Sequence, residues 1–313
     1  MNNGEFERIA RYFAPLANEA ALGLTDDAAV WLPPTGRALV LTLDQMIEGV
    51  HFLADDPPDC VARKLLRRNL SDLAAMGAAP IGYLLTTALR ATTPEPWLAM
   101  FAEGLRVDQE RYGITLFGGD STSTAGPLMV SATMIGQVAP GAAWRRSGAR
   151  AGDAMFVTGT IGDAVLGLEA ARGNIDDPTL RFRERRLLPE PRVGLAIAGL
   201  VHAAIDISDG LVQDVGHLCA ASGVGAVIEA GLVPRSAAAR AAGDDWLAAR
   251  LTGGDDYELV IAAPVEAEPA LRAGCGDVAI TRIGFFTGSH QDVIVRDAAG
   301  AAMSFARPGW RHF

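Results

Sequence analysis

A single carboxylate, that of Asp72, lies inside a run of small and apolar residues between Asn69 and Pro80. Aspartate is a poor helix former and is rarely buried unless it is paired or bound to a metal. The run contains no cationic side chain, and Ser71 already suits the role of a helix cap. The chain must therefore fold so that Asp72 meets either a side chain from a distant segment or an ion.

The length and charge of the chain narrow the function classes. It has 313 residues, of which 50% are hydrophobic, so it can bury a large core and is expected to form two domains. The formal net charge of −10 disfavours nucleic acid and anionic membrane surfaces as partners, because both repel a chain of the same sign. An anionic substrate would need metal ions to bind here.

The cysteines and the apolar runs indicate a compartment. Cys60, Cys219 and Cys275 lie far apart and have no histidine at zinc-like spacing, so we expect reduced thiols in a cytoplasmic protein. The N-terminus lacks the basic start and apolar core of a secretion signal. The longest apolar run, residues 193–207, is interrupted by His202, so no membrane-spanning segment is expected.

Apolar periodicity, interrupted by glycine and proline turns, predicts helices and strands in alternation. The predicted helices span residues 5–17, 61–76, 97–112, 162–171 and 193–203. The predicted strands span residues 38–43, 83–89, 114–117, 128–138, 152–159, 226–228 and 260–262. Residues 22–31 are expected to form a hairpin with the first strand. This alternation predicts a mixed α/β (α+β) chain with a domain boundary near residue 145, giving domains 1–145 and 146–313.

Many aspartates follow an apolar strand or a glycine turn, which is where α/β proteins collect ligands. They are Asp26, Asp27, Asp44, Asp72, Asp120, Asp206, Asp209, Asp255 and Asp256. Carboxylates that converge without lysine or arginine must be metal-bound, solvated or protonated. Hard oxygen ligands with few histidines favour Mg²⁺ over zinc or copper.

Each of these residues also has a simpler interpretation. Aspartate before glycine is common in turns, and aspartate or serine before a helix is common as a cap. A lone histidine such as His51 is more often a hydrogen-bonded core or surface residue than a ligand. The turn at residues 159–162 lacks the Gly-Lys-Ser/Thr ending of a phosphate-binding loop, so it does not indicate a nucleotide.

Several segments together are far more specific than any one of them. They are LTDDAAV (24–30), EGVHF (48–52), NLSDLAAMG (69–77), GGDST (118–122), RSGA (146–149), DISDGL (206–211), GGDDYEL (253–259) and the terminal HF (312–313). In this order, the segments resemble those of the thiamine-monophosphate kinase family, and the resemblance runs from Gly4 to Phe313.

The resemblance implies a fold and an activity. The fold is the two-domain architecture of the aminoimidazole ribonucleotide synthetase-like superfamily, with an N-terminal domain that carries a dimerising mixed sheet and a C-terminal α/β domain. The activity is ATP-dependent phosphorylation of thiamine monophosphate to thiamine diphosphate with several Mg²⁺ ions. The resemblance also implies a homodimer.

The resemblance further implies roles for individual residues. The Mg²⁺ ligands would be Asp27, Thr42, Asp44, Asp72, Asp120, Asp206 and Asp209. The ATP contacts would be Gly119, Asp120, Arg146 and Ser208. The thiamine-phosphate side would be His51, Asp255 and a C-terminal aromatic residue, Trp310. Catalysis would depend on Asp72, Asp120, Asp209 and Arg146.

Phosphate chemistry is compatible with these roles. The second pKa of a phosphate monoester is about 6, so the acceptor is already mostly a deprotonated nucleophile at neutral pH and needs no general base. The barrier lies in bringing two polyanions together, and positioning with charge neutralisation lowers it. We therefore expect direct in-line transfer from ATP without a phosphoenzyme.

Three positions depart from the family pattern. Thr25 replaces a common glycine, which would be costly if the backbone there needed a positive φ. Leu43 replaces a serine or threonine and removes one hydroxyl ligand. Asp255 replaces glutamate and keeps the charge with a shorter reach.

Two alternatives remain at this point. One is another ATP-dependent enzyme of the superfamily, although the chain lacks the early or terminal cysteine that selenophosphate synthetase or the hydrogenase-maturation protein would need. The other is a non-catalytic protein that binds a nucleotide or thiamine phosphate and in which Thr25 and Leu43 weaken metal binding.

Overall fold

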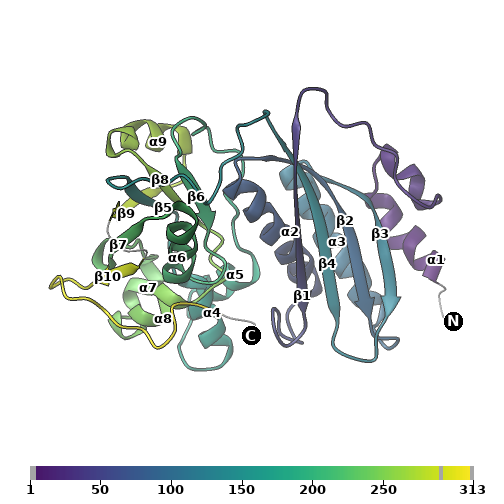
Figure 1. Ribbon diagram of the computed structural model, residues 1–313. Helices are drawn as coiled ribbons and strands as arrows, with labels where there is room; N and C mark the ends of the chain where they lie inside the picture. The colour runs from purple at the N-terminus through teal and green to yellow at the C-terminus, as the bar shows by residue number, and fades with distance from the viewer. Residues whose placement is uncertain (1–4, 289–291, 311–313) are drawn as a thin grey trace. The chain divides into compact units, whose positions relative to one another are not determined.

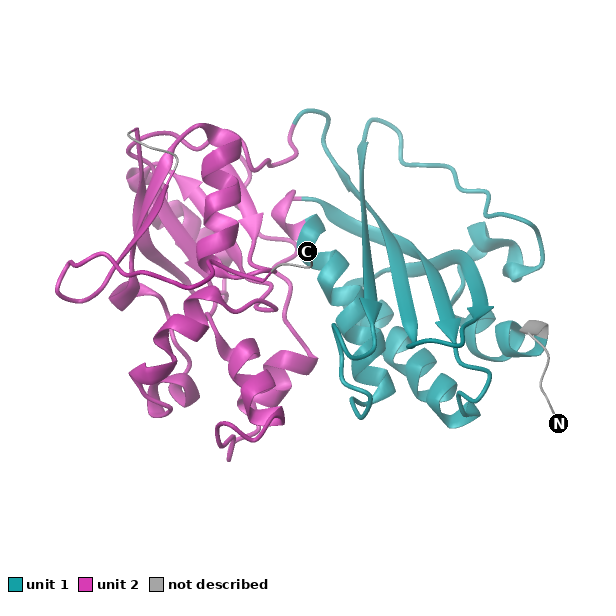
Figure 2. Cartoon of the chain, turned by 60° about the horizontal axis from the view of Figure 1, so that its bottom comes forward, with its two compact units in different colours: residues 1–73, 78–141 teal, residues 74–77, 142–313 magenta. Residues whose placement is uncertain are grey.

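The computed structural model describes residues 5–288 and 292–310. The chain divides into two compact units (Figure 2): unit 1 comprises residues 1–73 and 78–141, and unit 2 comprises residues 74–77 and 142–313. The terminal HF segment of the sequence pattern lies outside the described residues. The predicted mixed α/β class is confirmed, because each unit contains one mixed sheet together with helices.

Unit 1 is a four-stranded sheet with two long helices on one of its faces (Figure 1). Its elements are β1 (Ala38–Ile47), α2 (Pro58–Ala75), β2 (Ala79–Leu89), α3 (Glu95–Tyr112), β3 (Thr115–Ser123) and β4 (Met129–Val138). The strand order is β1-β4-β2-β3, in which β4 is antiparallel to both neighbours and β2 is parallel to β3. The edge strands β1 and β3 both carry predicted site residues.

The predicted hairpin between residues 22–31 and the first strand is wrong. Strand β1 pairs instead with β4, with Ala38 opposite Val138 and Ile47 opposite Met129. Residues 22–31 lie outside the strands, and the backbone at Leu22 and Leu24 has positive φ angles of 52° and 59°. Side chains in this conformation do not fit an extended strand, and the long-range pairing with β4 takes the place of the local turn.

The N-terminal segment, residues 5–24, is helical as predicted, but it is not one α-helix. It begins with α1 (Glu5–Arg8), which widens to a π-helical turn at Ile9–Phe13 and then tightens to a 3₁₀ turn at Ala14–Leu16. A second 3₁₀ segment follows at Glu19–Leu24. Asn18 caps that second segment by accepting a hydrogen bond from the Ala21 N–H at 3.1 Å. The segment lies beside β3 in Figure 1.

Unit 2 is a six-stranded sheet with helices on both faces. Its strands are β5 (Ala154–Thr158), β6 (Ala203–Asp206), β7 (Gly225–Glu229), β8 (Leu259–Ala263), β9 (Ile280–Thr287) and β10 (Val293–Arg296), in the order β10-β7-β9-β5-β8-β6. Its helices are α4 (Asp163–Ala171), α5 (Arg181–Leu187), α6 (Leu211–Ser222), α7 (Ala237–Ala241), α8 (Leu247–Thr252) and α9 (Glu268–Cys275). Among the described strand pairs of this second sheet, only β10–β7 is parallel.

The predicted helix at residues 193–203 is wrong. Residues 193–202 form turns, and β6 begins at Ala203. Gly194 and Gly199 have φ angles of 80° and 82°, which interrupt a right-handed helix. The apolar side chains of this segment still serve the core, because Ile197 is fully buried.

The small residues at the end of α2 serve packing rather than capping. Ser71 is fully buried within α2, so the expected capping role is wrong. Ala74 and Ala75 pack in one apolar cluster with Trp144. Gly77 has a φ of 64°, and a Cβ there would lie 2.7 Å from the indole of Trp144, so the chain turns under that ring. No helix in the described part of the chain is both long and apolar enough to cross a bilayer.

Candidate functional site

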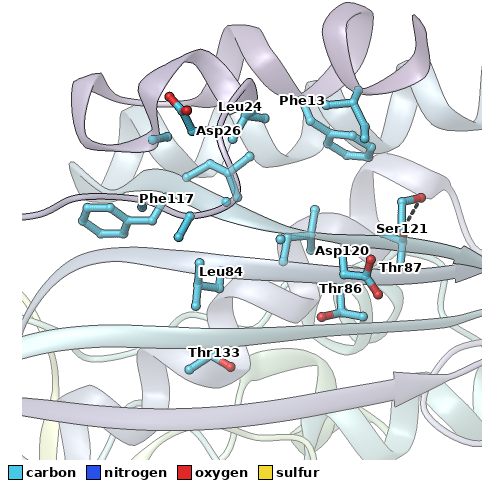
Figure 3. Close-up of a pocket in the computed structure, with 18 of the residues that line it drawn as sticks. Phe13, Leu24, Asp26, Leu84, Thr86, Thr87, Phe117, Asp120, Ser121 and Thr133 are labelled. Atoms are coloured by element: carbon cyan, nitrogen blue, oxygen red, sulfur yellow. Dashed lines mark hydrogen bonds between the residues drawn. The ribbon is translucent and has the colours of Figure 1, made fainter. Parts of the chain in front are cut away.

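A pocket of about 680 Å³ opens in unit 1 between the N-terminal segment and strands β2 and β3 (Figure 3). Three exposed carboxylates line it: Asp26 and Asp27 from the N-terminal segment and Asp120 from β3. Residues with hydroxyl groups also line it: Thr86, Thr87, Ser121 and Thr133. The described lining residues include no lysine or arginine. Such a set of oxygen donors suits a hard cation such as Mg²⁺.

Asp120 is held in place by the pairing of β3 with β2. The run from Gly118 to Thr122 was expected to be a loop after a strand, but it continues β3, and Asp120 lies opposite Thr86. The hydroxyl of Thr87 donates to Ser121 Oγ at 3.0 Å next to it. At Gly119 a Cβ would come within 1.8 Å of the Leu85 carbonyl oxygen, so the two strands approach each other this closely only with glycine there.

A second group of predicted ligands lies around α2. The hydroxyl of Thr42 on β1 donates a hydrogen bond to Asp72 Oδ2. Arg68, one helical turn before Asp72, pairs through Nη2 with Asp44 Oδ1 at 3.2 Å. Asp72 therefore has a partner from a distant segment, as its place in the helix required.

The two groups of unit 1 lie on opposite faces of the sheet. Gln45, Ser131, Thr86 and Asp120 are paired in one row across the four strands, and residues of one row share a face. Asp44 belongs to the adjacent row and Thr42 to one of the same parity, so both point to the face that packs on α2. Within unit 1, Asp27 and Asp120 thus line one pocket, whereas Thr42 and Asp72 are hydrogen-bonded to each other on the other face of the sheet.

His51 is oriented by a local contact. The backbone N–H of Ile47 donates to His51 Nδ1 at 3.1 Å, and Lys64 Nζ donates to the His51 carbonyl at 3.3 Å. Because Nδ1 accepts, a neutral His51 ring carries its proton on Nε2. Its predicted role toward thiamine phosphate remains a prediction.

In unit 2 the predicted residues after β6 are arranged by a residue that the sequence analysis did not select, Asp214. Its Oδ2 accepts hydrogen bonds from the N–H groups of Ser208, Asp209 and Gly210 at 3.1, 3.0 and 3.0 Å. Burial raises the pKa of Asp214 to about 7, against the opposing effect of these N–H groups. Asp214 fixes the loop that presents Ser208 and Asp209. The spacing Asp-Gly-x-x-x-Asp, which brings a helical carboxylate back to its own N-terminus, was the available signal.

Four of the predicted residues meet at this loop. The Asp255 N–H donates to the Ser208 carbonyl at 2.8 Å, and the Trp310 N–H donates to the Asp209 carbonyl at 2.9 Å. Asp255 has a φ of 71° and accepts a hydrogen bond from the Tyr257 hydroxyl at 2.9 Å. Ser208, Asp209, Asp255 and Trp310 therefore form one cluster, with buried Asp206 at the end of β6 just before it.

A potential ligand group adjoins this cluster. Among the described residues, Asp209, Asp214 and His217 place one ligand atom each within 4.8 Å of one another. His217 was not selected from the sequence; its place three residues after Asp214, on the same helical face, was the only signal.

Arg146 lies at the other end of α6 from this cluster. Its carbonyl accepts from Ser222 Oγ at 3.0 Å, and Ser222 is the last residue of the helix. Asp209 precedes the first turn of the same helix, so 12 helical residues separate the two, about 18 Å. Within unit 2 the structure does not bring Arg146 to Asp209, and its role toward ATP remains a prediction.

The GGDDYEL segment begins with half-buried residues up to Asp255 and continues with buried ones from Asp256. Asp256 is buried, and both of its carboxylate oxygens accept from the Gly162 N–H, at 3.0 and 2.9 Å. Burial raises the pKa of Asp256 well above its usual value. Glu258 is also buried and pairs with Arg185 and Arg192. Asp256, counted among the acidic corners in the sequence, therefore stabilises the unit rather than a ligand.

Two of the departures from the family pattern have little structural cost. Thr25 has a φ of −109°, an ordinary value for a residue with a Cβ. Leu43 is 63% exposed and points to the face opposite Thr42 and Asp44, so a hydroxyl there would not reach Asp44 or Asp72.

Family models match most of the chain. Residues 25–138 match "AIR synthase related protein, N-terminal domain", and residues 150–296 match "AIR synthase related protein, C-terminal domain". The chain is 41% identical to the thiamine-monophosphate kinase of Caulobacter vibrioides, over 98% of this chain and 90% of that protein. It is 37% identical to the thiamine-monophosphate kinase of Salmonella typhimurium, over 99% of this chain and 98% of that protein.

Solved structures agree with these relatives. The thiamine-monophosphate kinase of Stenotrophomonas maltophilia matches with a TM-score of 0.81 at 39% identity, covering 90% of this chain and 91% of that one. A structure described as AaThiL complexed with AMPPCP and TMP matches with a TM-score of 0.79 at 30% identity, covering 99% and 97%. Hydrogenase maturation protein HypE, at 19% identity and a TM-score of 0.79, shares the fold.

Proposed function

This chain belongs to the thiamine-monophosphate kinase family, and from that premise we propose that it transfers the γ-phosphoryl group of ATP to thiamine monophosphate, forming thiamine diphosphate. A relative that covers almost the whole chain has been solved with AMPPCP and TMP, which supports this pair of ligands. The observation in this chain that carries the proposal is the pocket that Asp26, Asp27 and Asp120 line, without a cationic side chain among the described lining residues.

Mg²⁺ fits these residues. Carboxylate and hydroxyl oxygens are the ligands that Mg²⁺ prefers, and Asp27 with Asp120 would hold it in the pocket of unit 1. Asp206 and Asp209 would do so in unit 2, with Asp44, Thr42 and Asp72 as the third group. When bound, the metal neutralises charge on the phosphates of both substrates. Because the acidic residues form three separate groups, we propose that more than one Mg²⁺ ion binds.

The protein's own part in the reaction is binding and orientation. The acceptor phosphate has a pKa near 6, so no side chain has to remove a proton from it at neutral pH. Positioning and charge neutralisation then dominate the rate, and transfer is direct and in line. Gly119, Ser208 and Arg146 would contact ATP, whereas His51, Asp255 and Trp310 would contact thiamine monophosphate. A cytoplasmic location fits the use of ATP.

ADP release with and without thiamine monophosphate tests the activity. We expect release to depend on thiamine monophosphate and on Mg²⁺, with neither thiamine nor an aminoimidazole precursor replacing the substrate. Stabilisation by the ligands without turnover would instead identify a binding protein. Recovery of labelled phosphoprotein after incubation with γ-labelled ATP would rule out direct transfer.

The change Asp72→Asn tests whether the carboxylate of α2 serves a ligand. Asparagine keeps an oxygen acceptor for the Thr42 hydroxyl, so the fold should be retained and the melting temperature should change by only a few degrees. Loss of the charge should lower Mg²⁺-dependent kcat by about tenfold or more. If Asp72→Asn unfolds and the activity per folded molecule is unchanged, Asp72 is structural.

We also propose a homodimer that forms through the edge of the unit 1 sheet. Leu39, Leu41 and Leu43 alternate along edge strand β1 on one face and are 42%, 65% and 63% exposed. An exposed apolar stripe on an unpaired edge is a site of association.

The change Leu41→Glu should convert the dimer to a monomer, because two copies of the charge would meet across a two-fold interface. Light scattering coupled to size-exclusion chromatography measures the mass. Leu32→Glu is the control, since Leu32 is 90% exposed but lies outside the strands. A Leu41→Glu variant with the mass of the unaltered protein would exclude this face as the interface.

A further inference from the structure

The C-terminal segment is attached to the beginning of α6 through one side chain, that of Gln213. Its Nε2 donates to the Trp310 carbonyl at 2.7 Å and to Asp209 Oδ2 at 3.2 Å. The Trp310 N–H donates to the Asp209 carbonyl at 2.9 Å. Both backbone groups of Trp310 are therefore bonded to the first turn of α6 or to the loop before it.

Close packing reinforces these hydrogen bonds. Gly309 lies so near α6 that a Cβ there would be 2.5 Å from Gln213 Cβ and 2.8 Å from the Asp209 carbonyl oxygen. Only glycine allows the chain to pass at this distance. The C-terminal segment thus packs against Gln213 at Gly309, the residue before Trp310.

The side chain of Trp310 contrasts with its fixed backbone. Tryptophan is usually well buried, yet this residue is 53% exposed beside the Asp209 loop. An aromatic ring with an anchored backbone and an open face suits a ligand that has an apolar or cationic ring. The thiazolium ring of thiamine monophosphate is such a group.

We propose that Gln213 is a positioning residue for the substrate: it fixes Trp310 beside Asp209, so that the indole and the carboxylate face the same molecule. This inference rests on the proposed function. The amide of Gln213 serves both acceptors because it carries two N–H donors, whereas glutamate at this position would carry none. Alanine would remove both contacts and leave the helix intact.

The first test is kinetic. Gln213→Ala should raise the KM for thiamine monophosphate about fivefold to tenfold, as expected for the loss of one or two hydrogen bonds, with kcat within about threefold. The KM for ATP should stay within about twofold. Gln213→Glu should be more severe, because its carboxylate would face that of Asp209. Ala220→Ser, at an exposed position of the same helix, is the matched control.

A double-mutant cycle tests whether Gln213 acts through Trp310. Trp310→Ala should raise the KM for thiamine monophosphate by itself, and adding Gln213→Ala should raise it no further. Additive effects of the two changes would overturn the proposal. So would a Gln213→Ala variant in which only kcat falls, since that would assign Gln213 to the chemical step.

Hydrogen exchange provides a readout that requires no catalysis. The amide hydrogen of Trp310 should be protected in the unaltered protein and should exchange about tenfold faster in Gln213→Ala, with α6 unchanged. If the unaltered protein shows no turnover but this difference in exchange is present, the proposed function fails and the anchoring of Trp310 stands. If turnover is normal and neither KM nor exchange responds to Gln213→Ala, the positioning role fails alone.

Discussion

The change Asp120→Asn is expected to lower kcat by about 10²–10³-fold, the largest loss of activity that we predict for a single substitution. Asp120 is exposed at the pocket and lies on β3 opposite Thr86 of β2. The pairing of the two strands fixes its backbone, so its position does not depend on the charge of its side chain. Asparagine has nearly the same shape, and the change therefore removes a negative charge from a set of three carboxylates without disturbing the strand.

Steady-state kinetics over a range of Mg²⁺ concentrations measures this effect. The concentration required for half-maximal activity should rise in Asp120→Asn, because one anionic ligand is lost. Asp55→Asn, an exposed aspartate of the same unit outside the pocket, is the control and should behave like the unaltered protein. Activity of Asp120→Asn within twofold of the unaltered protein would exclude Asp120 from the catalytic set.

The change Glu258→Gln is expected to produce the largest loss of stability, about 3–5 kcal/mol. The carboxylate of Glu258 is fully buried and holds three partners: Oε1 lies 3.0 Å from Arg185 Nη2, and Oε2 lies 2.6 Å from Arg192 Nε and 2.7 Å from Thr158 Oγ1. Glutamine keeps the volume but leaves two guanidinium groups without their buried counter-charge. Gly159 leaves room for this group, because a Cβ there would lie 2.0 Å from Glu258 Oε1.

Urea denaturation followed by circular dichroism measures the loss. Asp255→Asn is the matched control from the same segment, since its amide oxygen can still accept from the Tyr257 hydroxyl and its stability should change by less than about 1 kcal/mol. We expect the reverse order in substrate affinity, with Asp255→Asn raising the KM for thiamine monophosphate. Equal stability of the two variants would contradict the assignment of a structural role to Glu258 and not to Asp255.

Much of the fold followed from local pattern. The apolar periodicity of α2 and α3 and the alternation along β4 predicted these elements within a few residues of their observed bounds. Two elements were predicted wrongly: the hairpin at residues 22–43, judged from an apolar strand and the turn at residues 33–36, and the helix at 193–203, judged from its apolar content. Their outcomes depended on a distant partner strand, β4, and on the backbone angles of Gly194 and Gly199.

The sequence could not distinguish fully buried acids from partly exposed ones. Asp255 and Asp256 are neighbours with the same side chain, but Asp256 is buried against Gly162, whereas Asp255 is half-buried and accepts from the Tyr257 hydroxyl. Adjacent residues point in different directions, and which direction is buried depends on what packs there. The same reason hides Gln213, whose two contacts come from residues four and 97 positions away.

The sequence by itself determined the family, the mixed α/β class and the requirement that Asp72 have a partner, because these depend on residue type and order along the chain. Only the tertiary structure decided that this partner includes the Thr42 hydroxyl and that Asp27 and Asp120 share a pocket. It also separated Asp44 and Asp72 from Asp120 across the sheet. The physical reason is that a side chain's partners are set by strand register and helix packing, which join residues whose separation in sequence carries no signal.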